Sequence, residues 1–227
     1  MSIQTCEFVS PKHPDKICDH IADSILDAYL ALDPHARVAV EVMGGHGAVT
    51  VSGEVTSACA VDIVKIVDGI VGPGFQTVLR LSKQSPEIAR GVDDGGAGDQ
   101  GIMIGYATSE TANHMPHAYN LARDLCKAVY ERFPYDGKTQ VTIENGEVTT
   151  VVTSFQNAKT DELTRLVRSK IRAREYLINP GGEWTLGGFD ADSGLTGRKL
   201  VIDSYGPSVP IGGGSFSGKA STKVDRS

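Results

Sequence analysis

Near the start of the chain, apolar residues recur every four positions, the spacing of a helix that buries one face. Pro14 suits the first turn of such a helix, because proline lacks an N–H that a first turn leaves unbonded. Asp33-Pro34 then supplies a stop signal. The pattern predicts an amphipathic helix that begins at Pro14. Its periodic residues are Ile17, Ile21, Ile25 and Tyr29.

After this helix the period changes to two, which is typical of half-buried strands. Valines alternate with other residues over 38–42 and again over 49–55, with a glycine-rich turn between them. These two segments predict a β-hairpin. A helix over about 58–70 and a strand near 77–82 complete one unit of helices and sheet.

The same order of patterns then repeats. A helix from 115 to 133 precedes a strand over 140–144, an Asn145-Gly146 turn and a strand over 147–154. A helix over 161–174 follows. The repetition predicts two similar α+β layers.

Beyond residue 180 the composition becomes glycine-rich, and one strand is predicted at Lys199–Asp203. The chain stops in the middle of what the pattern indicates is a third unit. We therefore expect an α+β fold with an N-terminal domain over 1–90, a central domain over 91–180 and an incomplete C-terminal domain over 181–227.

Composition excludes several classes of protein. The 227 residues are 40% hydrophobic and 22% charged, and no apolar run is long enough to span a bilayer, so no membrane partner is expected. A formal charge of −6 argues against general affinity for nucleic acid. Four scattered cysteines form no CxxC pair, and the N-terminus lacks the pattern of a signal peptide. We expect reduced thiols and a cytoplasmic protein.

The segment SPKHPDK places His13, Asp15 and Lys16 where the first predicted helix begins. Free backbone N–H groups and the helix dipole favour an anion at that point. The alternative is that Asp15 only complements the dipole and the lysines are solvated. Alone, the segment does not decide between these readings.

Two glycine-rich segments also suit phosphate chemistry. GVDDGGAGDQG, at 91–101, carries Asp93, Asp94 and Asp99, whose oxygens could hold Mg²⁺ on phosphate, although glycine and aspartate equally form plain surface loops. GGSFSGKA, at 213–220, departs from a P-loop because Ala220 stands where Ser or Thr would hold Mg²⁺.

A third segment, SGLTGRKLVID, directly follows Asp192 and brings Arg198 and Lys199 close to it, either as a surface charge cluster or as part of a site. Glycine, acid and base interleave repeatedly along the whole chain. That combination favours a site for metal and polyphosphate, in which cations neutralise developing negative charge.

Six ordered motifs together resemble the S-adenosylmethionine synthetase family, also called methionine adenosyltransferases. GAGDQG and GGGSFSGK are especially specific to that family. The resemblance runs from about Cys6 to the last residue. The six are HPDK at 13–16, SGEVT at 52–56, KQSPEI at 83–88, GAGDQG at 96–101, GLTGRK at 194–199 and GGGSFSGK at 212–219.

The resemblance implies a pseudo-threefold arrangement of similar domains and a two-step reaction. The sulfur of L-methionine attacks C5′ of ATP and releases triphosphate, which is cleaved to phosphate and pyrophosphate. A thioether has no proton to remove, so the first step needs alignment and stabilisation of the leaving group, not a general base. Lysine, arginine and metal suit that task.

The resemblance also implies roles for individual residues. His13 would stabilise the leaving oxygen, and Trp184 would stack on adenine. Mg²⁺, two ions per site, would bind Asp15 and Asp225, and K⁺ would bind Glu41. Glu54 and Gln84 would hold the amino-acid part of methionine, with Asp99 near methionine and Asp192 near adenosine. The triphosphate would be gripped by Lys138, Arg198, Lys199, Lys219 and Lys223.

The sequence departs from the family in three ways. The loop between Gln84 and Gly96 is shorter than the family's gating loop, and several other connections are trimmed. Ala220 replaces the family's usual acid. The chain also ends after the opening of the third domain, which would leave strand edges and apolar surface exposed. Either another chain supplies the missing part, or the chain is an incomplete gene product or a naturally minimal version.

These features leave three functional hypotheses. The leading one is a methionine adenosyltransferase that binds ATP and L-methionine and forms a homodimer or homotetramer with shared active sites. The rival is a catalytically inactive, truncated homologue that acts as a partner or regulatory subunit. The third is a generic ATP-binding module, indifferent to methionine.

Overall fold

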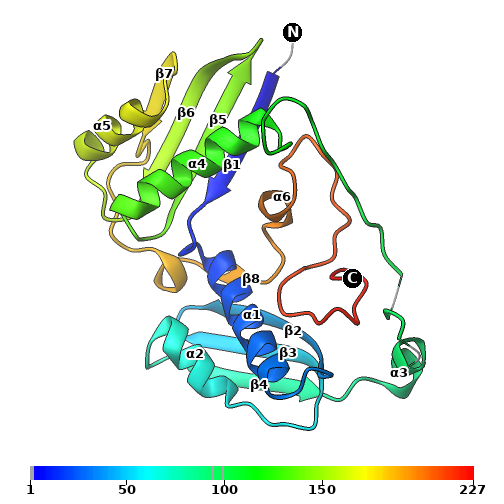
Figure 1. Cartoon of the computed structure of the whole chain (residues 1–227). Coiled ribbons are helices and arrows are strands. Elements are labelled where there is room, and N and C mark those ends of the chain that lie inside the picture. Colours follow the sequence, from blue (N-terminus) through cyan, green and yellow to red (C-terminus); the bar gives the residue numbers. More distant parts are fainter. Residues whose placement is uncertain (1–2, 94, 99) are drawn as a thin grey trace. The chain divides into compact units, whose positions relative to one another are not determined.

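A computed structural model describes residues 3–93, 95–98 and 100–227, and its chain divides into two compact units (Figure 1). Each unit is assembled from separate stretches of sequence. The α1 unit comprises Pro14–Met103, Phe189–Leu200 and Gly212–Ser227. The α4 unit comprises the described part of Met1–His13, Ile104–Gly188 and Val201–Ile211.

The α1 unit is a four-stranded sheet with helices, and its strand order is β4-β3-β2-β8. Neighbouring strands are antiparallel except β3 and β4, whose parallel pairing requires a crossover, which α2 provides. The elements are α1 (Pro14–Leu32), β2 (Arg37–Gly45), β3 (Ala48–Thr56), α2 (Ile63–Val71), β4 (Gln76–Ser82), α3 (Pro86–Asp93) and β8 (Gly194–Leu195).

The core of the α1 unit forms where α1 packs on β2. Val38, Val40 and Val42 are fully buried and share one cluster with Ile21 and Ile25 of α1. Burial of each such side chain contributes about 1.5–3 kcal/mol. Because successive strand residues point to opposite faces, the intervening positions of β2 point away from this core, and they include a predicted site residue, Glu41.

The α4 unit repeats this order of elements. Its sheet has the order β1-β5-β6-β7, with β6 and β7 parallel after a crossover through α5. Asn145 and Gly146 both have positive φ angles, +51° and +86°, as a tight hairpin turn between β5 and β6 requires. The elements are β1 (Ile3–Val9), α4 (His117–Arg132), β5 (Gly137–Glu144), β6 (Glu147–Phe155), α5 (Thr160–Lys170) and β7 (Glu175–Ile178).

Each unit thus runs helix, hairpin, helix and parallel strand, which confirms the predicted α+β fold with a repeated layer. In the α4 unit, α4 packs against β1 and β5 (Figure 1). One buried cluster on this side of the sheet includes Ala122 and Val129 of α4 with Val141 of β5.

The strand predicted at Lys199–Asp203 is wrong, because Leu200–Asp203 form a short helix, α6. A short apolar run has no periodicity that separates a strand from a helical turn. Here Leu200 and Ile202 are both buried, and the carbonyl of Ile202 accepts a hydrogen bond of 2.8 Å from the Tyr119 hydroxyl. A 3₁₀ turn, η1 (Gly188–Asp190), precedes this region.

Two other helix boundaries differ from the predicted ones. The helix expected from residue 58 begins at Ile63, because Asp62 caps it by accepting the N–H of Lys65. The helix expected to reach residue 174 ends at Lys170. The sequence did not predict β1, β7 or α3, and α3 takes up the first residues of the expected loop at 91–101.

Candidate active site

The first charged group of the α1 unit surrounds Asp15, in the first turn of α1. Its side chain is only 3% exposed and lies 2.5 Å from Lys199 Nζ, while Arg198 Nε lies 3.9 Å away. Asp15 Oδ1 also accepts the N–H of Leu195 at 2.9 Å. The chain approaches this closely because residue 194 is glycine: a Cβ there would lie 2.1 Å from the carbonyl oxygen of Pro14.

The second group surrounds Lys219, which lies beside β2 through a bridge between Ala39 and Lys219. Its ammonium is largely buried and lies 3.1 Å from Asp225 and 3.7 Å from Glu41. Glu41 also accepts a hydrogen bond from the Thr196 hydroxyl. Two predicted metal ligands are thus paired with the same predicted phosphate-binding lysine.

The third group lines a narrow depression that leaves no room for a water molecule. Glu54 Oε2 lies 3.7 Å from Lys223 Nζ, and Arg37 Nη1 lies 3.5 Å from Gln84 Oε1. Among the described residues, Glu54 Oε2 is a buried oxygen without a hydrogen-bond partner. This depression therefore combines two predicted methionine-binding side chains with one predicted cation.

The remaining predicted site residues are distributed differently. Asp192 belongs to the α1 unit, where it is exposed and accepts the N–H of Ser193. His13, Lys138 and Trp184 belong to the α4 unit. Asp94 and Asp99 of the predicted magnesium loop lie outside the described residues.

In the α4 unit these three residues lie in ordinary polar surroundings. Lys138 lies 3.5 Å from Glu7 of β1, and both side chains are nearly half exposed. Trp184 Nε1 donates to Ser154 Oγ at 2.9 Å. The backbone N–H of His13 donates to the carbonyl of Ser10.

Sequence reasoning missed two further aspartates of α1. Asp19 accepts the N–H of Gly197 at 3.0 Å, and Asp23 accepts the N–H of Gly218 at 2.9 Å. The signal was available, because Asp15, Asp19 and Asp23 are four residues apart and therefore share one face of the helix.

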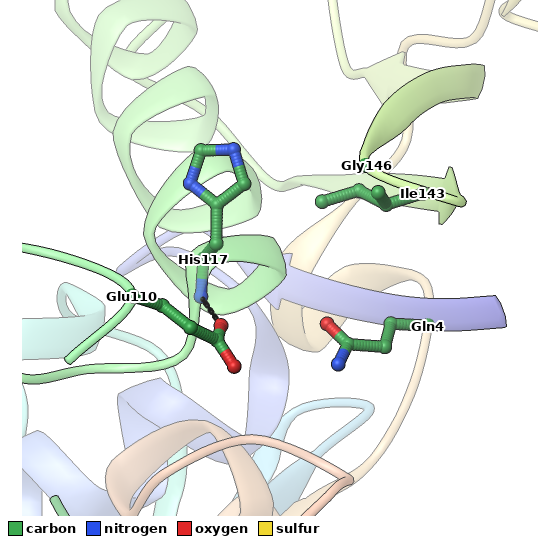
Figure 2. A pocket seen from close by; sticks show the side chains of 5 residues that line it. All are labelled: Gln4, Glu110, His117, Ile143 and Gly146. Carbon is green, nitrogen blue, oxygen red and sulfur yellow. Dashed lines mark hydrogen bonds between the residues drawn. The ribbon is translucent and has the colours of Figure 1, made fainter. Parts of the chain in front are cut away.

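A separate pocket of about 350 Å³ lies in the α4 unit (Figure 2). It is lined by Gln4, Glu110, His117, Ile143 and Gly146. Glu110 Oε2 accepts the backbone N–H of His117 at 3.0 Å, so this carboxylate already satisfies the start of α4 (Figure 2). Among the residues that the structure describes, none of the predicted site residues lines this pocket.

Three of the four cysteines are buried thiols that are not activated as nucleophiles. Burial raises the pKa of Cys6 to about 11 and the pKa values of Cys18 and Cys126 to about 12. These thiols therefore stay protonated and unreactive at neutral pH. Cys59 is exposed, and none of the four forms a disulfide.

Within residues 3–93, 95–98 and 100–227, no group of three or more His, Cys, Asp or Glu side chains could hold a metal ion by itself. In the same part of the chain, no helix is long and apolar enough to cross a membrane. The charged groups described above are lysine–carboxylate pairs.

Comparison with known proteins assigns the family. Residues 1–89 match the N-terminal domain of S-adenosylmethionine synthetase, residues 94–184 the central domain and residues 186–227 the C-terminal domain. The chain belongs to the S-adenosylmethionine synthetase family.

Curated relatives are S-adenosylmethionine synthases. The chain is 41% identical to the protein of Clostridium tetani over 279 residues, 42% identical to that of Desulforudis audaxviator over 277 and 41% identical to that of Nocardia farcinica over 284. Each match covers 98% of this chain and 70–71% of the relative. The aligned stretches are longer than the 227-residue chain, so the relatives contain segments within them that this chain lacks.

Proposed function

We infer that the protein is a methionine adenosyltransferase, which forms S-adenosylmethionine from ATP and L-methionine and releases phosphate and pyrophosphate. The observation that carries this function is the set of lysine–carboxylate pairs in the α1 unit of a chain that belongs to the S-adenosylmethionine synthetase family. A triphosphate leaving group needs such cations, and a thioether nucleophile needs no base.

The cations would act by changing partners. Lys199 and Lys219 are each held by a carboxylate, Asp15 and Asp225 respectively. An incoming triphosphate offers each ammonium a more highly charged partner, while the carboxylates keep the lysines in position beforehand. We assign Arg198, Lys138 and Lys223 to the same triphosphate, and His13 to the leaving oxygen, on the basis of the family motifs.

The depression around Glu54 suits the amino-acid part of methionine. The buried Glu54 oxygen that lacks a hydrogen-bond partner among the described residues would accept a substrate ammonium group. Gln84 would bind beside it, and the depression would have to open when substrate enters. Trp184 and Asp192 would contact the adenosine, and Asp99 would lie near methionine.

The family uses metal ions, and we propose two Mg²⁺ ions per site with K⁺ as activator. Asp15 and Asp225 offer the carboxylate oxygens that Mg²⁺ prefers, and Glu41 would serve K⁺. Mg²⁺ commonly binds through one or two carboxylates plus substrate phosphates, so we propose that these carboxylates and the phosphates of ATP would hold it together. Bound metal would neutralise charge on the phosphates.

We also propose a cytoplasmic homodimer or homotetramer with shared active sites. Ile102 and Met103 are 75% and 65% exposed, and a partner chain would cover such apolar side chains. In this proposal the three domains are 1–90, 91–180 and 181–227. The rival function, an inactive partner subunit, is not favoured, because the relatives are synthases at about 40% identity over nearly the whole chain.

Mass spectrometry tests the function directly. Purified chain is incubated with ATP, L-methionine, Mg²⁺ and K⁺, and S-adenosylmethionine is measured. We expect product from the wild type, none from Asp15→Asn, and an unchanged amount from Asp27→Asn, an exposed acid of the same helix. A folded sample without product would instead support the inactive subunit. ATP binding that is indifferent to methionine in calorimetry would support the generic ATP-binding module.

A further inference from the structure

We propose that Asp19 and Asp23 are positioning residues that hold the two glycine-rich loops carrying Arg198, Lys199 and Lys219. This inference rests on the proposed function, because those three cations are its triphosphate-binding groups. Neither aspartate belongs to the motifs that relate the chain to its family, and neither contacts one of the three cations directly. Both act through the backbone.

The geometry of α1 places the carboxylates in a row. Asp15, Asp19 and Asp23 are four residues apart, so they share one helix face, with about 6 Å of rise between neighbours. Each accepts a different backbone N–H, that of Leu195, Gly197 and Gly218 respectively, at 2.9–3.0 Å. One rigid helix therefore holds two loops that are distant from it in sequence.

The hydrogen-bonded peptide groups immediately precede the cations. The N–H of Gly197 lies one residue before Arg198 and two before Lys199, and the N–H of Gly218 lies one residue before Lys219. A fixed peptide group limits the positions that the next side chain can reach. Hydrogen bonds from N–H groups to carboxylates are also about twice as strong as neutral ones. The two aspartates thus fix the backbone positions from which the side chains of Arg198, Lys199 and Lys219 extend.

Close packing shows that the loops are pressed onto the helix. A Cβ at Gly218 would lie 2.8 Å from Ala22 Cβ and 2.5 Å from the carbonyl oxygen of Val40, and Gly218 has a φ angle of +73°. Only glycine fits there without displacement. Asp19 is almost fully buried and also pairs with Lys16 at 2.9 Å, so its carboxylate is itself held in place.

Asp23 offers the sharper test because it is half-buried. Asp23→Ala removes the acceptor, whereas Asp23→Asn removes the charge and keeps an amide oxygen that can accept the same N–H. Asp27→Ala, an exposed residue of α1, is the matched control. If Asp23→Ala does not fold, Asp23→Leu replaces it, because leucine matches the shape of the carboxylate without accepting a hydrogen bond.

We expect Asp23→Ala to lower kcat about tenfold, the effect of one lost hydrogen bond to a charged group, with little change in KM for methionine. The kcat of Asp23→Asn should be much closer to the wild-type value than that of Asp23→Ala. In calorimetry with Mg²⁺ and inorganic tripolyphosphate, Asp23→Ala should bind about tenfold more weakly than the wild type. Asp27→Ala should match the wild type in both measurements.

Four results would separate the positioning role from the proposed function. An Asp23→Ala enzyme with wild-type kcat and tripolyphosphate affinity overturns the positioning role, and so does an Asp23→Asn enzyme as impaired as Asp23→Ala. A wild-type chain that forms no product but binds tripolyphosphate in an Asp23-dependent way supports the positioning role and contradicts only the proposed function. A wild-type chain that neither forms product nor binds tripolyphosphate in an Asp23-dependent way contradicts both the positioning role and the proposed function.

Discussion

At the scale of single residues, Asp15 combines a buried structural position with a proposed role in metal binding. Its carboxylate is nearly excluded from water, yet Lys199 and the N–H of Leu195 satisfy both oxygens. A buried ion pair is costly to break on one side only, because the remaining buried charge then loses its closest counter-charge. A loss of activity in a variant of either residue therefore has to be separated from a loss of stability.

A double-mutant cycle makes that separation. We expect Lys199→Met to lower the free energy of unfolding by about 3 kcal/mol, because it leaves Asp15 charged and buried. The double variant Asp15→Asn/Lys199→Met should lose clearly less free energy of unfolding than the sum of the losses in the two single variants. Urea unfolding followed by circular dichroism measures all three.

Arg198→Met serves as the control for this cycle. Arg198 is 57% exposed and its Nε lies 3.9 Å from Asp15, so its removal should cost less than about 1 kcal/mol. If the losses of unfolding free energy in the Asp15 and Lys199 variants are strictly additive, the inferred coupling between the two residues is wrong.

At the scale of elements, α5 begins with a cap that comes from a distant part of the sequence. Lys159, at the N-cap position, provides no side-chain cap of its own. Instead Glu183 accepts the N–H of Thr160 at 2.9 Å and pairs with Lys159 at 2.8 Å. The hydrogen bond from Lys159, followed by that from Thr160, lowers the pKa of Glu183 below its usual range.

This lowered pKa predicts a pH dependence of stability. A carboxyl group with a lower pKa in the folded chain than in the unfolded chain stabilises the fold at neutral pH, and the contribution is lost as the pH falls through the folded pKa. We expect Glu183→Gln to lower the melting temperature at pH 7 and to reduce its fall between about pH 6 and about pH 3. Thermal melts across this range measure both effects.

The control is Glu131→Gln, which alters an exposed acid of α4 and should leave the pH profile unchanged. If Glu183→Gln has the same pH profile as the wild type, the cap contributes nothing to acid stability.

At the scale of the whole molecule, the same order of elements occurs in both units, but each unit draws on separate stretches of the chain. Residues 212–227 belong to the α1 unit, where bridges pair Lys219 with Ala39 and Lys223 with Gly98. The last residues therefore contribute predicted site side chains to a unit whose first helix begins at Pro14. Removal of residues 212–227 would take Lys219 away from Glu41 and would remove Asp225 from the predicted site.

An enzyme with shared active sites should lose activity when its subunits separate. We expect the specific activity to stay constant at high protein concentration and to fall on dilution below the dissociation constant of the oligomer. Product formation measured over a dilution series, beside light scattering for mass, tests this. Constant activity in a sample that light scattering shows to be monomeric would contradict the shared site.

Much of the fold could be predicted from the sequence, because helix and hairpin signals are local. The period of four in α1 and the Asn145-Gly146 turn both led to correct elements. β1 and β7 were missed because their strand character depends on pairing with β5 and β6 respectively. α6 was mistaken for a strand because four residues are too few to show a period.

The sequence by itself determined the helices α1, α2, α4 and α5, the two hairpins and the family, because short, contiguous patterns in the chain encode each of them. It also supplied the residues that we propose for the site. Only the tertiary structure decided which charges meet. Lys199 reaches Asp15 across 184 residues, and Gly218 reaches Asp23 across 195. Such pairs depend on the close approach of glycine backbones to α1, and no local period encodes that packing.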